Sequence, residues 1–281
     1  MCQFIVVDNG SEPDKIIELR RQLPGKAHLL ETMENLGIAA AQNAGVQYAY
    51  RKLEQRPQYL LFLDQDSLPI GEMVRQLRET YEATKLLDPK VAALGPALID
   101  RRNQQFQRLH HETMGFYWTR KLAMDGPGNV FRVASVNSSG TFVELGRFNQ
   151  IGGFREELFI DHVDTEWSYR ARHLGYSLYV TTEAVMEHEM GRDLEEIWLF
   201  GEKAFPSRAP LRHYYLFRNN IYLLWQEQMT RTWKFWSLIK LSFTFCYFGF
   251  LSADRTEQRK MMLRGARAGW KGELGKISLE P

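Results

Sequence analysis

Two aspartates follow an apolar run in the first quarter of the chain. Leu60-Leu61-Phe62-Leu63 is typical of a buried parallel strand, and Asp64-Gln65-Asp66 comes directly after it. Open α/β sheets bind ligands at the carboxyl ends of their strands, so both carboxylates are expected in a cleft. Acids at positions i and i+2 can hold a divalent cation whose other ligands are water and phosphate oxygens. A polar turn before the helix after Pro69 is the structural alternative, and the strand context favours the metal site.

Three further polar segments occupy positions where chemistry is possible. Asp8 follows the apolar run Phe4–Val7, although Asp8-Asn9-Gly10-Ser11 is also ordinary turn sequence. Asp161-His162-Val163-Asp164 begins a helical pattern, where acids are also favoured by the helix dipole. His188 follows a strand-like run, and a single histidine in such a place is often structural.

The first 100 residues alternate strand-like and helical patterns, which predicts βαβ units and a mostly parallel sheet. The expected strands are Phe4–Val7, His28–Leu30, Tyr59–Leu63 and Val91–Gly95. The expected helices run from Ser11 or Pro13 to Leu23, from Ile38 to Leu53 and from Gly71 to Leu87. These elements would form the scaffold that positions the polar segments.

The middle of the chain is less regular. Residues 100–130 lose periodicity and are interpreted as a loop-rich insertion. A helix is expected from Asp161 to His173 with Gly175 as its stop, followed by strands Ser177–Val180 and Ala184–Glu187. We expect one catalytic domain over residues 1–210 and a helical region over 211–281.

The C-terminal region is aromatic and basic. An aromatic helix is expected from Arg212 to Trp225, and Trp233–Leu251 approaches the length of a membrane span. Lys234 and Lys240 make a segment lying flat on the membrane the better interpretation, and a buried helix is the alternative. The basic residues after it suit an anionic leaflet: Arg255, Arg259, Lys260, Arg264, Arg267 and Lys271.

Composition excludes several classes of protein. The chain has 281 residues, of which 44% are hydrophobic and 25% charged, so it is globular rather than disordered. Thirty-six basic and 34 acidic side chains give a formal charge of +2, too even for non-specific nucleic-acid binding. Cys2 and Cys246 provide neither a disulfide framework nor zinc-ligand spacing, which fits a reducing compartment. No secretory-signal pattern is visible at the start.

Several of these segments occur together in an order that resembles family 2 glycosyltransferases, in particular bacterial rhamnosyltransferases of O-antigen and other surface polysaccharides. The motifs that carry the resemblance are Phe4 to Ser11, Asn35 to Ala39 with Ala41-Gln42-Asn43, Asp64-Gln65-Asp66, Gly152-Gly153-Phe154, and Phe159 to Trp167 with Arg170. The resemblance implies a GT-A fold, in which helices flank a Rossmann-like sheet. It also implies a nucleotide-diphosphate sugar donor, Mg²⁺ or Mn²⁺, and inversion at the anomeric carbon.

The resemblance further assigns binding roles to individual side chains. Asp8 would contact the base or ribose of the donor, with Asn35 and Asn43 on the nucleotide side of the cleft. The remaining assignments are Asp64 to ribose and metal, Asp66 and His188 to the metal, and Arg218 to the diphosphate.

The catalytic base is less clearly assigned. Inverting transfer needs a group that takes the acceptor hydroxyl proton on the side opposite the leaving diphosphate. The family pattern has an acidic pair followed two residues later by Asp, whereas this chain has Asp161-His162-Val163-Asp164. Asp161 is the first choice, Asp164 the second, and His162 a third because imidazole titrates near neutrality.

The same resemblance predicts the partners. The expected donor is dTDP-rhamnose and the expected acceptor a polyprenyl-diphosphate-linked glycan, with the enzyme peripheral at the cytoplasmic face of the bacterial inner membrane. The family's first strand is expected to be missing from these 281 residues. A nucleotidyltransferase would usually carry a Gly-rich phosphate loop, which the sequence lacks, and a non-catalytic homologue serving as a membrane assembly partner is the other alternative.

Overall fold

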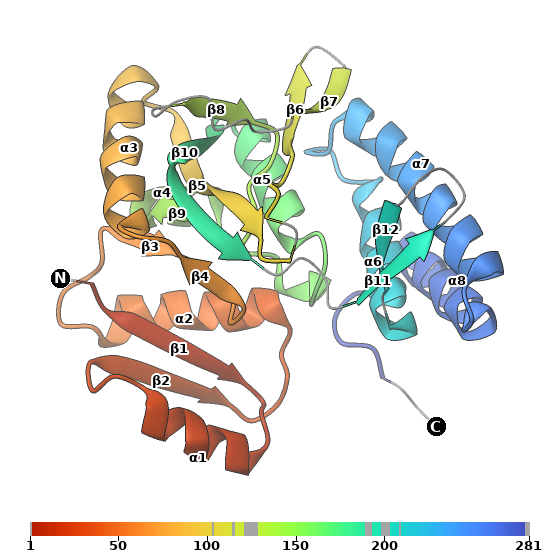
Figure 1. Ribbon diagram of the computed structural model, residues 1–281, viewed down its shortest axis with the longest axis horizontal. Helices are drawn as coiled ribbons and strands as arrows, with labels where there is room; N and C mark the ends of the chain where they lie inside the picture. The colour runs from red at the N-terminus through yellow and green to blue at the C-terminus, as the bar shows by residue number, and fades with distance from the viewer. Residues whose placement is uncertain are drawn as a thin grey trace.

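The computed structural model describes residues 2–102, 104–113, 116–120, 129–188, 193–197, 203–207 and 209–278. An α/β body holds the main sheet, and the C-terminal helices stand at its side (Figure 1). The expected α/β class is therefore confirmed.

The main sheet has six strands in the order β3-β9-β5-β10-β4, with β8 also paired to β10. The strands are β3 Tyr59–Leu61, β4 Ser67–Pro69, β5 Val91–Asp100, β8 Val130–Val133, β9 Phe142–Glu144 and β10 Ser177–His188. β5 and β10 are parallel, but β9 lies antiparallel between β3 and β5. The sheet is thus mixed, which corrects the expectation of a mostly parallel one. Alternation of strands and helices does not report the direction in which a short strand such as β9 enters a sheet.

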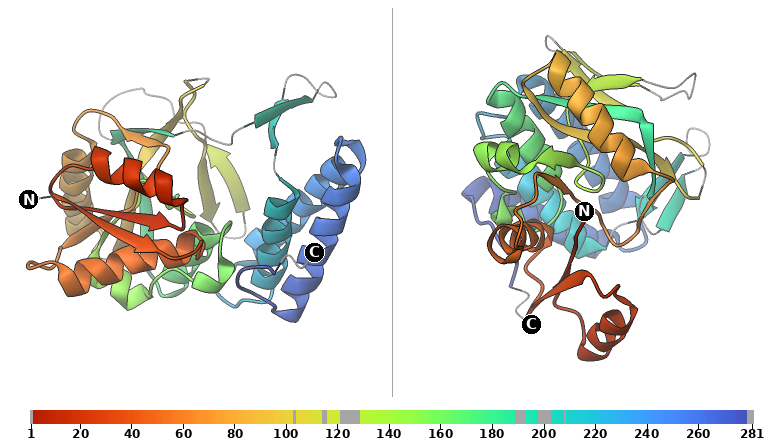
Figure 2. Two further views of the ribbon diagram at one scale, coloured as in Figure 1. Left: turned by 90° about the horizontal axis from the view of Figure 1, so that it is seen from below. Right: turned by 90° about the vertical axis from the view of Figure 1, so that its left-hand side faces the viewer.

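The N-terminal strands form a separate parallel pair, β1 Phe4–Asn9 with β2 Ala27–Thr32. Helix α1, Pro13–Gln22, connects them, and α2, Ile38–Lys52, packs against β1. Figure 2 shows this unit projecting from the rest of the α/β body. All three helices expected in the first 90 residues are present, the third as α3, Met73–Leu87.

Apolar cores lie on both faces of the main sheet. One core contains Phe62, Phe148 and Trp167 and involves α4, Leu145–Ile151, and α5, Val163–His173. The other includes Leu77 of α3. The sheet is therefore covered on both faces, and the ends of its strands remain accessible for a site.

Several details differ from the sequence expectations. Residues 100–130 contain a hairpin, β6 Leu109–Thr113 with β7 Phe116–Arg120, rather than loop alone. β10 is one strand with a register shift between Thr181 and Val185, rather than two. Helix α5 begins at Val163, because the two residues before it have left-handed backbone angles. A second hairpin pairs β11, Asp193–Ile197, with β12, Lys203–Ser207.

The C-terminal region is helical, as expected. It contains α6 Pro210–Leu223, α7 Arg231–Cys246, a π-helical turn Tyr247–Leu251 and α8 Arg255–Lys271. A side chain at Gly265 or Gly269 would collide with the main-chain carbonyls of Tyr214 or Arg218, so α8 packs directly on α6. None of the described helices is both long and apolar enough to cross a membrane.

Candidate active site

Three potential metal ligands converge at the ends of the strands. Asp64 follows β3, Asp66 immediately precedes β4, and His188 is the last residue of β10. The antiparallel pairing of β10 with β4 sets His188 opposite Ser67 and so brings the ligands together. Their ligand atoms lie within 4.8 Å of one another, and His188 Nδ1 is 3.4 Å from Asp66 Oδ1. The structure therefore joins side chains that are more than 120 positions apart in sequence.

A chain of hydroxyl groups supports this cluster. Ser67 Oγ is 3.0 Å from His188 Nδ1 and 2.6 Å from Ser139 Oγ. The main-chain N–H of Asp64 donates to Ser139 Oγ at 3.0 Å. Sequence reasoning assigned no role to Ser139. Ser139 precedes Gly140, whose φ of +89° permits a tight turn. The glycine was therefore the sequence signal that could have drawn attention to Ser139.

The site concentrates negative charge. Burial raises the pKa of Asp64, and the charges of Asp66 and Asp164 raise it further, while His188 lowers it. Burial also raises the pKa of Asp164. Hydrogen bonds from Thr165 and Ser138 oppose that shift, and the charge of Asp161 adds to it. A cation at this place would offset the repulsion among the carboxylates.

The donor set suits Mg²⁺ or Mn²⁺. Two carboxylates and one imidazole supply oxygen and nitrogen ligands, and both metals accept further oxygen ligands from water or phosphate. Asp66 is exposed, whereas Asp64 and His188 are half-buried. One side of the cluster therefore remains open for a ligand that shares the metal.

The three candidate bases lie on a loop with unusual backbone angles and at the start of α5. Phe159, Asp161 and His162 all have φ between 62° and 64°, the left-handed region that side chains other than glycine rarely adopt. Each such residue costs about 1–3 kcal/mol and persists only where its surroundings hold it. Asp161 pairs with Arg212 at 3.4 Å. His162 Nε2 is 3.3 Å from Asn220 Nδ2, and its ring meets Trp233 edge-on.

Two neighbouring residues of α6 hold this loop. The side-chain amide of Asn219 donates to the main-chain oxygens of Leu158, Ile160 and Asp161 at 2.8–2.9 Å. The Arg218 guanidinium donates to Leu158 O at 2.8 Å and to Glu157 O at 3.2 Å.

The burial of Arg218 argues against the sequence-based prediction that this side chain binds the diphosphate. Its side chain is 1% exposed and also donates to Gly275 O. A guanidinium saturated with main-chain acceptors is not available for a ligand, so Arg218 is a positioning residue. Arg212 is half exposed and lines the cavity that also reaches the candidate metal ligands.

The donor-side residues have different environments. Asp8 is buried and accepts a hydrogen bond from the Ser11 N–H at 3.1 Å. Asn35 lines the cavity and accepts from the Gly37 N–H at 2.9 Å.

The Asn43 amide exchanges hydrogen bonds with the main chain of Phe154 at 2.8 and 2.9 Å. It also donates to Glu156 at 2.9 Å. These contacts make Asn43 a link between α2 and the Gly153–Glu156 segment, which corrects the expectation that it lines the nucleotide side.

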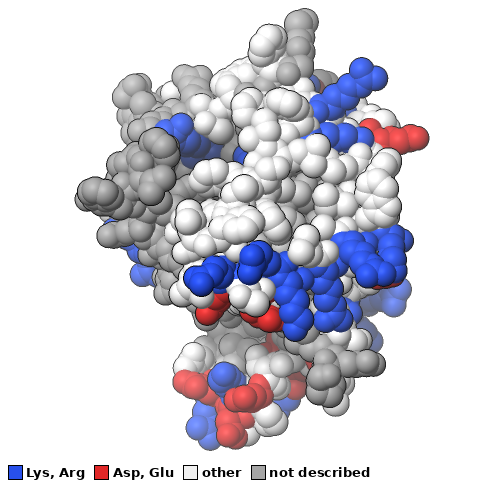
Figure 3. Space-filling model, turned by 90° about the vertical axis from the view of Figure 1, so that its right-hand side faces the viewer, with Lys and Arg blue, Asp and Glu red and all other residues white. Residues whose placement is uncertain are grey.

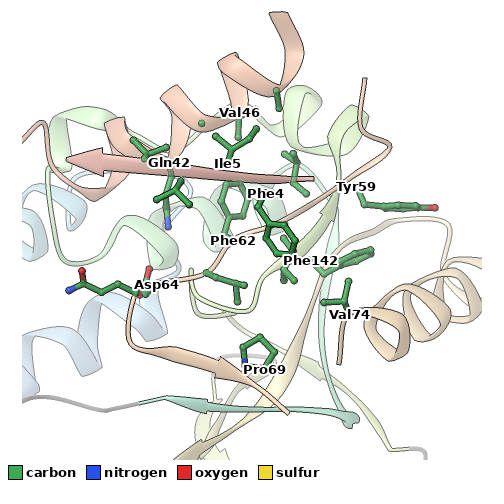
Figure 4. A pocket seen from close by; sticks show the side chains of 18 of the residues that line it. Phe4, Ile5, Gln42, Val46, Tyr59, Phe62, Asp64, Pro69, Val74 and Phe142 are labelled. Carbon is green, nitrogen blue, oxygen red and sulfur yellow. The ribbon is translucent and has the colours of Figure 1, made fainter. Parts of the chain in front are cut away.

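A large cavity opens beside the metal cluster (Figure 4). Its volume is about 3400 Å³, and its lining reaches Asp64, Asp66, His188 and Arg212. Figure 4 shows Phe4 and Ile5 of β1 on one side of it and Asp64 and Pro69 on another. The candidate ligands therefore face space that a substrate can enter.

Comparisons with known proteins identify the family of the chain. The profile of glycosyl transferase family 2 matches residues 2–139. A dTDP-rhamnosyl transferase, RfbF of Shigella flexneri, is 31% identical over 226 residues, which cover 79% of this chain and 71% of the relative.

Solved structures include GalNAc-T7 with UDP, GalNAc and Mn²⁺, with a TM-score of 0.55 and 14% identity over 96% of this chain and 50% of that one. TarS of S. aureus gives a TM-score of 0.47 and 14% identity over 91% of this chain and 41% of that one. The present chain thus spans half or less of the length of these two structures. With its GT-A-like sheet and the relationship to RfbF, the chain belongs to glycosyl transferase family 2.

Proposed function

We propose that the protein transfers L-rhamnose from dTDP-rhamnose to a saccharide acceptor, with inversion and with a divalent cation at Asp64, Asp66 and His188. The observation that carries the proposal is the convergence of these ligand atoms within 4.8 Å, in a family 2 chain related to a dTDP-rhamnosyl transferase. The cation, when bound, neutralises charge on the leaving diphosphate. The open side of the cluster, at the exposed Asp66, is where the diphosphate would approach.

Asp161 is proposed as the base that accepts the acceptor hydroxyl proton. Its side chain is 9% exposed and pairs with Arg212, which lines the cavity. Arg212 has the geometry to bind phosphate oxygens with two N–H groups. The two negative charges of a diphosphate would compete with the single charge of the Asp161 carboxylate for the Arg212 guanidinium. Donor binding would therefore release Asp161 for catalysis. Asp164, with its raised pKa, and His162 are the other candidates, and substitution distinguishes the three.

The acceptor is proposed to be a polyprenyl-diphosphate-linked glycan, with the enzyme lying peripherally on the cytoplasmic face of the inner membrane. Helix α7 buries only Trp233, Ser237 and Leu241, a single narrow stripe. Much of the remaining surface is apolar, with large exposed side chains at Phe235, Trp236, Leu238, Ile239 and Phe243.

Basic side chains accompany this apolar surface. Figure 3 shows Lys and Arg side chains as a band along the edge of an area with few charges. Arg255, Lys260, Arg264, Arg267 and Lys271 of α8 are exposed. Each basic residue near an anionic leaflet contributes about 1 kcal/mol. An apolar surface and a basic one together are sufficient for stable, reversible membrane binding.

Surface variants test the membrane proposal better than truncation. Removing α8 would uncover α6, whose Asn219 holds the loop at the site. Phe235→Ser with Phe243→Ser is expected to abolish co-sedimentation with anionic liposomes, and salt is expected to release the unmodified protein. The matched control is Leu86→Ser with Leu87→Ser, which changes two exposed residues on α3. Equal sedimentation of both double variants would assign the α7 surface to another role.

A panel of nucleotide sugars tests the transfer itself. dTDP release is expected with dTDP-rhamnose, metal and acceptor, and an inverted linkage is expected in the product. Faster turnover of a UDP-hexose would refute the donor while retaining the transferase. Binding of the donor with metal but without turnover would identify a non-catalytic homologue.

A further inference from the structure

The segment that follows α8, residues 272–278 (the post-α8 segment), lies on the side of the C-terminal helices that faces the α/β body (Figures 1 and 2). These described residues form neither helix nor strand. Gly272 and Gly275 have φ of +71° and +90°, backbone angles that glycine adopts readily. The course of the segment is therefore set by its glycines and by the groups that bind it.

The post-α8 segment binds the loop that carries Asp161 and His162. The main-chain N–H of Gly275 donates to Glu157 O at 2.7 Å, where the chain enters this loop. Gly275 O accepts from the Arg218 guanidinium, the same group that also donates to Glu157 O. One residue of the segment therefore contacts both the loop and the arginine that supports it.

A second contact reaches Phe159, one of the loop residues with left-handed backbone angles. The Ile277 N–H donates to the Tyr215 hydroxyl at 3.0 Å. The Tyr215 ring stacks on that of Phe159, with 4.9 Å between the ring centroids. The Ile277 side chain packs against the same apolar cluster as Phe159. The conformation of Phe159 therefore depends in part on the post-α8 segment.

The post-α8 segment also reaches the donor side of the cavity. Lys276 Nζ pairs with Glu34 Oε2 at 2.8 Å, and the next residue, Asn35, lines the cavity. Shortly after Asn35, the main-chain N–H of Ile38 donates to Phe159 O at 2.8 Å. Residues 34–38 and the base-bearing loop are thus neighbours, and the post-α8 segment contacts both.

We propose that the post-α8 segment is a positioning element for sugar transfer, which fixes the base-bearing loop relative to residues 34–38. This inference rests on the proposed function, since it requires the donor and the base on these two sides. Attack opposite the leaving group needs both sides at a set spacing, and a displacement of about 1 Å can cost about 10²-fold in rate. Asp64, Asp66 and His188 are held by the main sheet instead. Loosening the segment should therefore slow transfer while the metal ligands stay in place.

A pair of glycine variants tests the contact with the loop. Gly275→Ala and Gly272→Ala both place a side chain at a positive φ, and no atom lies within 4 Å of either added Cβ. Both variants therefore strain the backbone of the same segment, but of the two glycines Gly275 is the one that bonds to Glu157. We expect Gly275→Ala to slow dTDP release from dTDP-rhamnose about tenfold, with water as the acceptor. Mn²⁺-dependent dTDP binding should be retained, and Gly272→Ala should change neither property.

Hydrogen exchange tests the same contact without a sugar. The amide of Phe159 lies in the loop, and the amide of Ile38 is bonded to Phe159 O. Both amides are expected to exchange faster in Gly275→Ala than in Gly272→Ala. Tyr215→Phe, which removes the hydroxyl that binds Ile277, should change exchange in the same direction without altering a glycine.

A charge swap tests the contact with the donor side. Lys276→Glu is expected to weaken Mn²⁺-dependent dTDP binding about two- to fivefold, the range expected for an exposed ion pair. Combining it with Glu34→Lys restores opposite charges and should restore the affinity. Lys271→Glu is the matched control, because Lys271 pairs with Glu273 and both lysine side chains are 48% exposed. This control should bind dTDP as the unmodified protein does.

Three outcomes overturn the proposal. The first is equal exchange at Phe159 and Ile38 in the two glycine variants. The second is an equal loss of dTDP binding and turnover in Gly275→Ala, which would indicate a general structural role. The third is a failure of Glu34→Lys to rescue Lys276→Glu. If the unmodified protein released no dTDP, the proposed function would fail instead, and the exchange measurement would still decide whether the segment holds the loop.

Discussion

The candidate metal ligands and the loop that carries the candidate bases both adjoin one cavity but are held in different ways. Asp64, Asp66 and His188 lie at strand ends, where the sheet itself fixes their positions. Asp161 and His162 lie on a loop in left-handed conformations that hydrogen bonds from α6 maintain. Ligands on strands stay in place through the rigidity of the sheet, whereas the loop depends on distant side chains. The two halves should therefore respond differently to substitution.

The largest effect is expected at the metal cluster. Asp66→Asn removes a charged ligand and is expected to lower turnover at least about 10³-fold, because leaving-group charge is then poorly neutralised. Metal-dependent dTDP binding, measured by calorimetry, should be lost in the same variant. Asp14→Asn, on the exposed helix α1, is the control and should keep both properties. Full dTDP binding by Asp66→Asn would remove Asp66 from the metal site.

Asp161→Asn is expected to separate the two halves of the cleft. Loss of a general base costs about 10²–10⁴-fold in turnover. Metal-dependent dTDP binding should persist, because Asp161 is not part of the metal cluster. Asp164→Asn and His162→Gln, assayed beside it, should lower turnover less. A larger loss in either variant would transfer the role of base to that residue.

A smaller effect is expected when the support of the loop is removed. Asn219→Ala deletes the amide that donates to Leu158, Ile160 and Asp161. We expect turnover to fall about tenfold with little change in dTDP affinity, and stability to fall by about 1–3 kcal/mol from unsatisfied carbonyls. Asn149→Ala, at an exposed position of α4, should change neither quantity. Equal loss of dTDP binding and turnover in Asn219→Ala would show a general structural defect instead.

The smallest effect concerns pH. Because burial raises the pKa of Asp164, the folded protein binds a proton more tightly there than the unfolded chain does. The Asp164 carboxyl group therefore contributes most to folding stability at pH values below 3.8, the ordinary pKa of the group. This contribution is lost as the pH rises through the raised pKa. A tenfold difference in proton affinity between the folded and unfolded chain corresponds to about 1.4 kcal/mol. Denaturant unfolding over this pH range should show the slope, and Asp164→Asn should flatten it. An unchanged slope would show that other groups set the pH dependence.

The sequence predicted the half of the cleft that local pattern determines. An apolar run followed by Asp64-Gln65-Asp66 fixes a strand end, and His188 follows a strand in the same way. The βα scaffold around them was also predictable, because hydrophobic periodicity is local.

The other half depends on contacts between segments distant in the chain. The left-handed angles at Asp161 and His162 are maintained by α6, about 58 positions away, and no local pattern predicts them. The same limit explains Arg218 and Asn43, whose side chains bind main-chain atoms rather than line the donor site. Residue type allowed a ligand role in both cases, but the hydrogen bonds of these side chains to the main chain already use their polar atoms.

The most direct test of the central claim is the rate of dTDP release from dTDP-rhamnose in the presence of acceptor, measured with Mn²⁺ and with EDTA. The unmodified protein should release dTDP with Mn²⁺ and stop with EDTA, and restored Mn²⁺ should recover the rate in the unmodified protein but not in Asp66→Asn. Release that continues at the same rate in EDTA, or in Asp66→Asn, would contradict a metal-dependent transferase site at Asp64, Asp66 and His188.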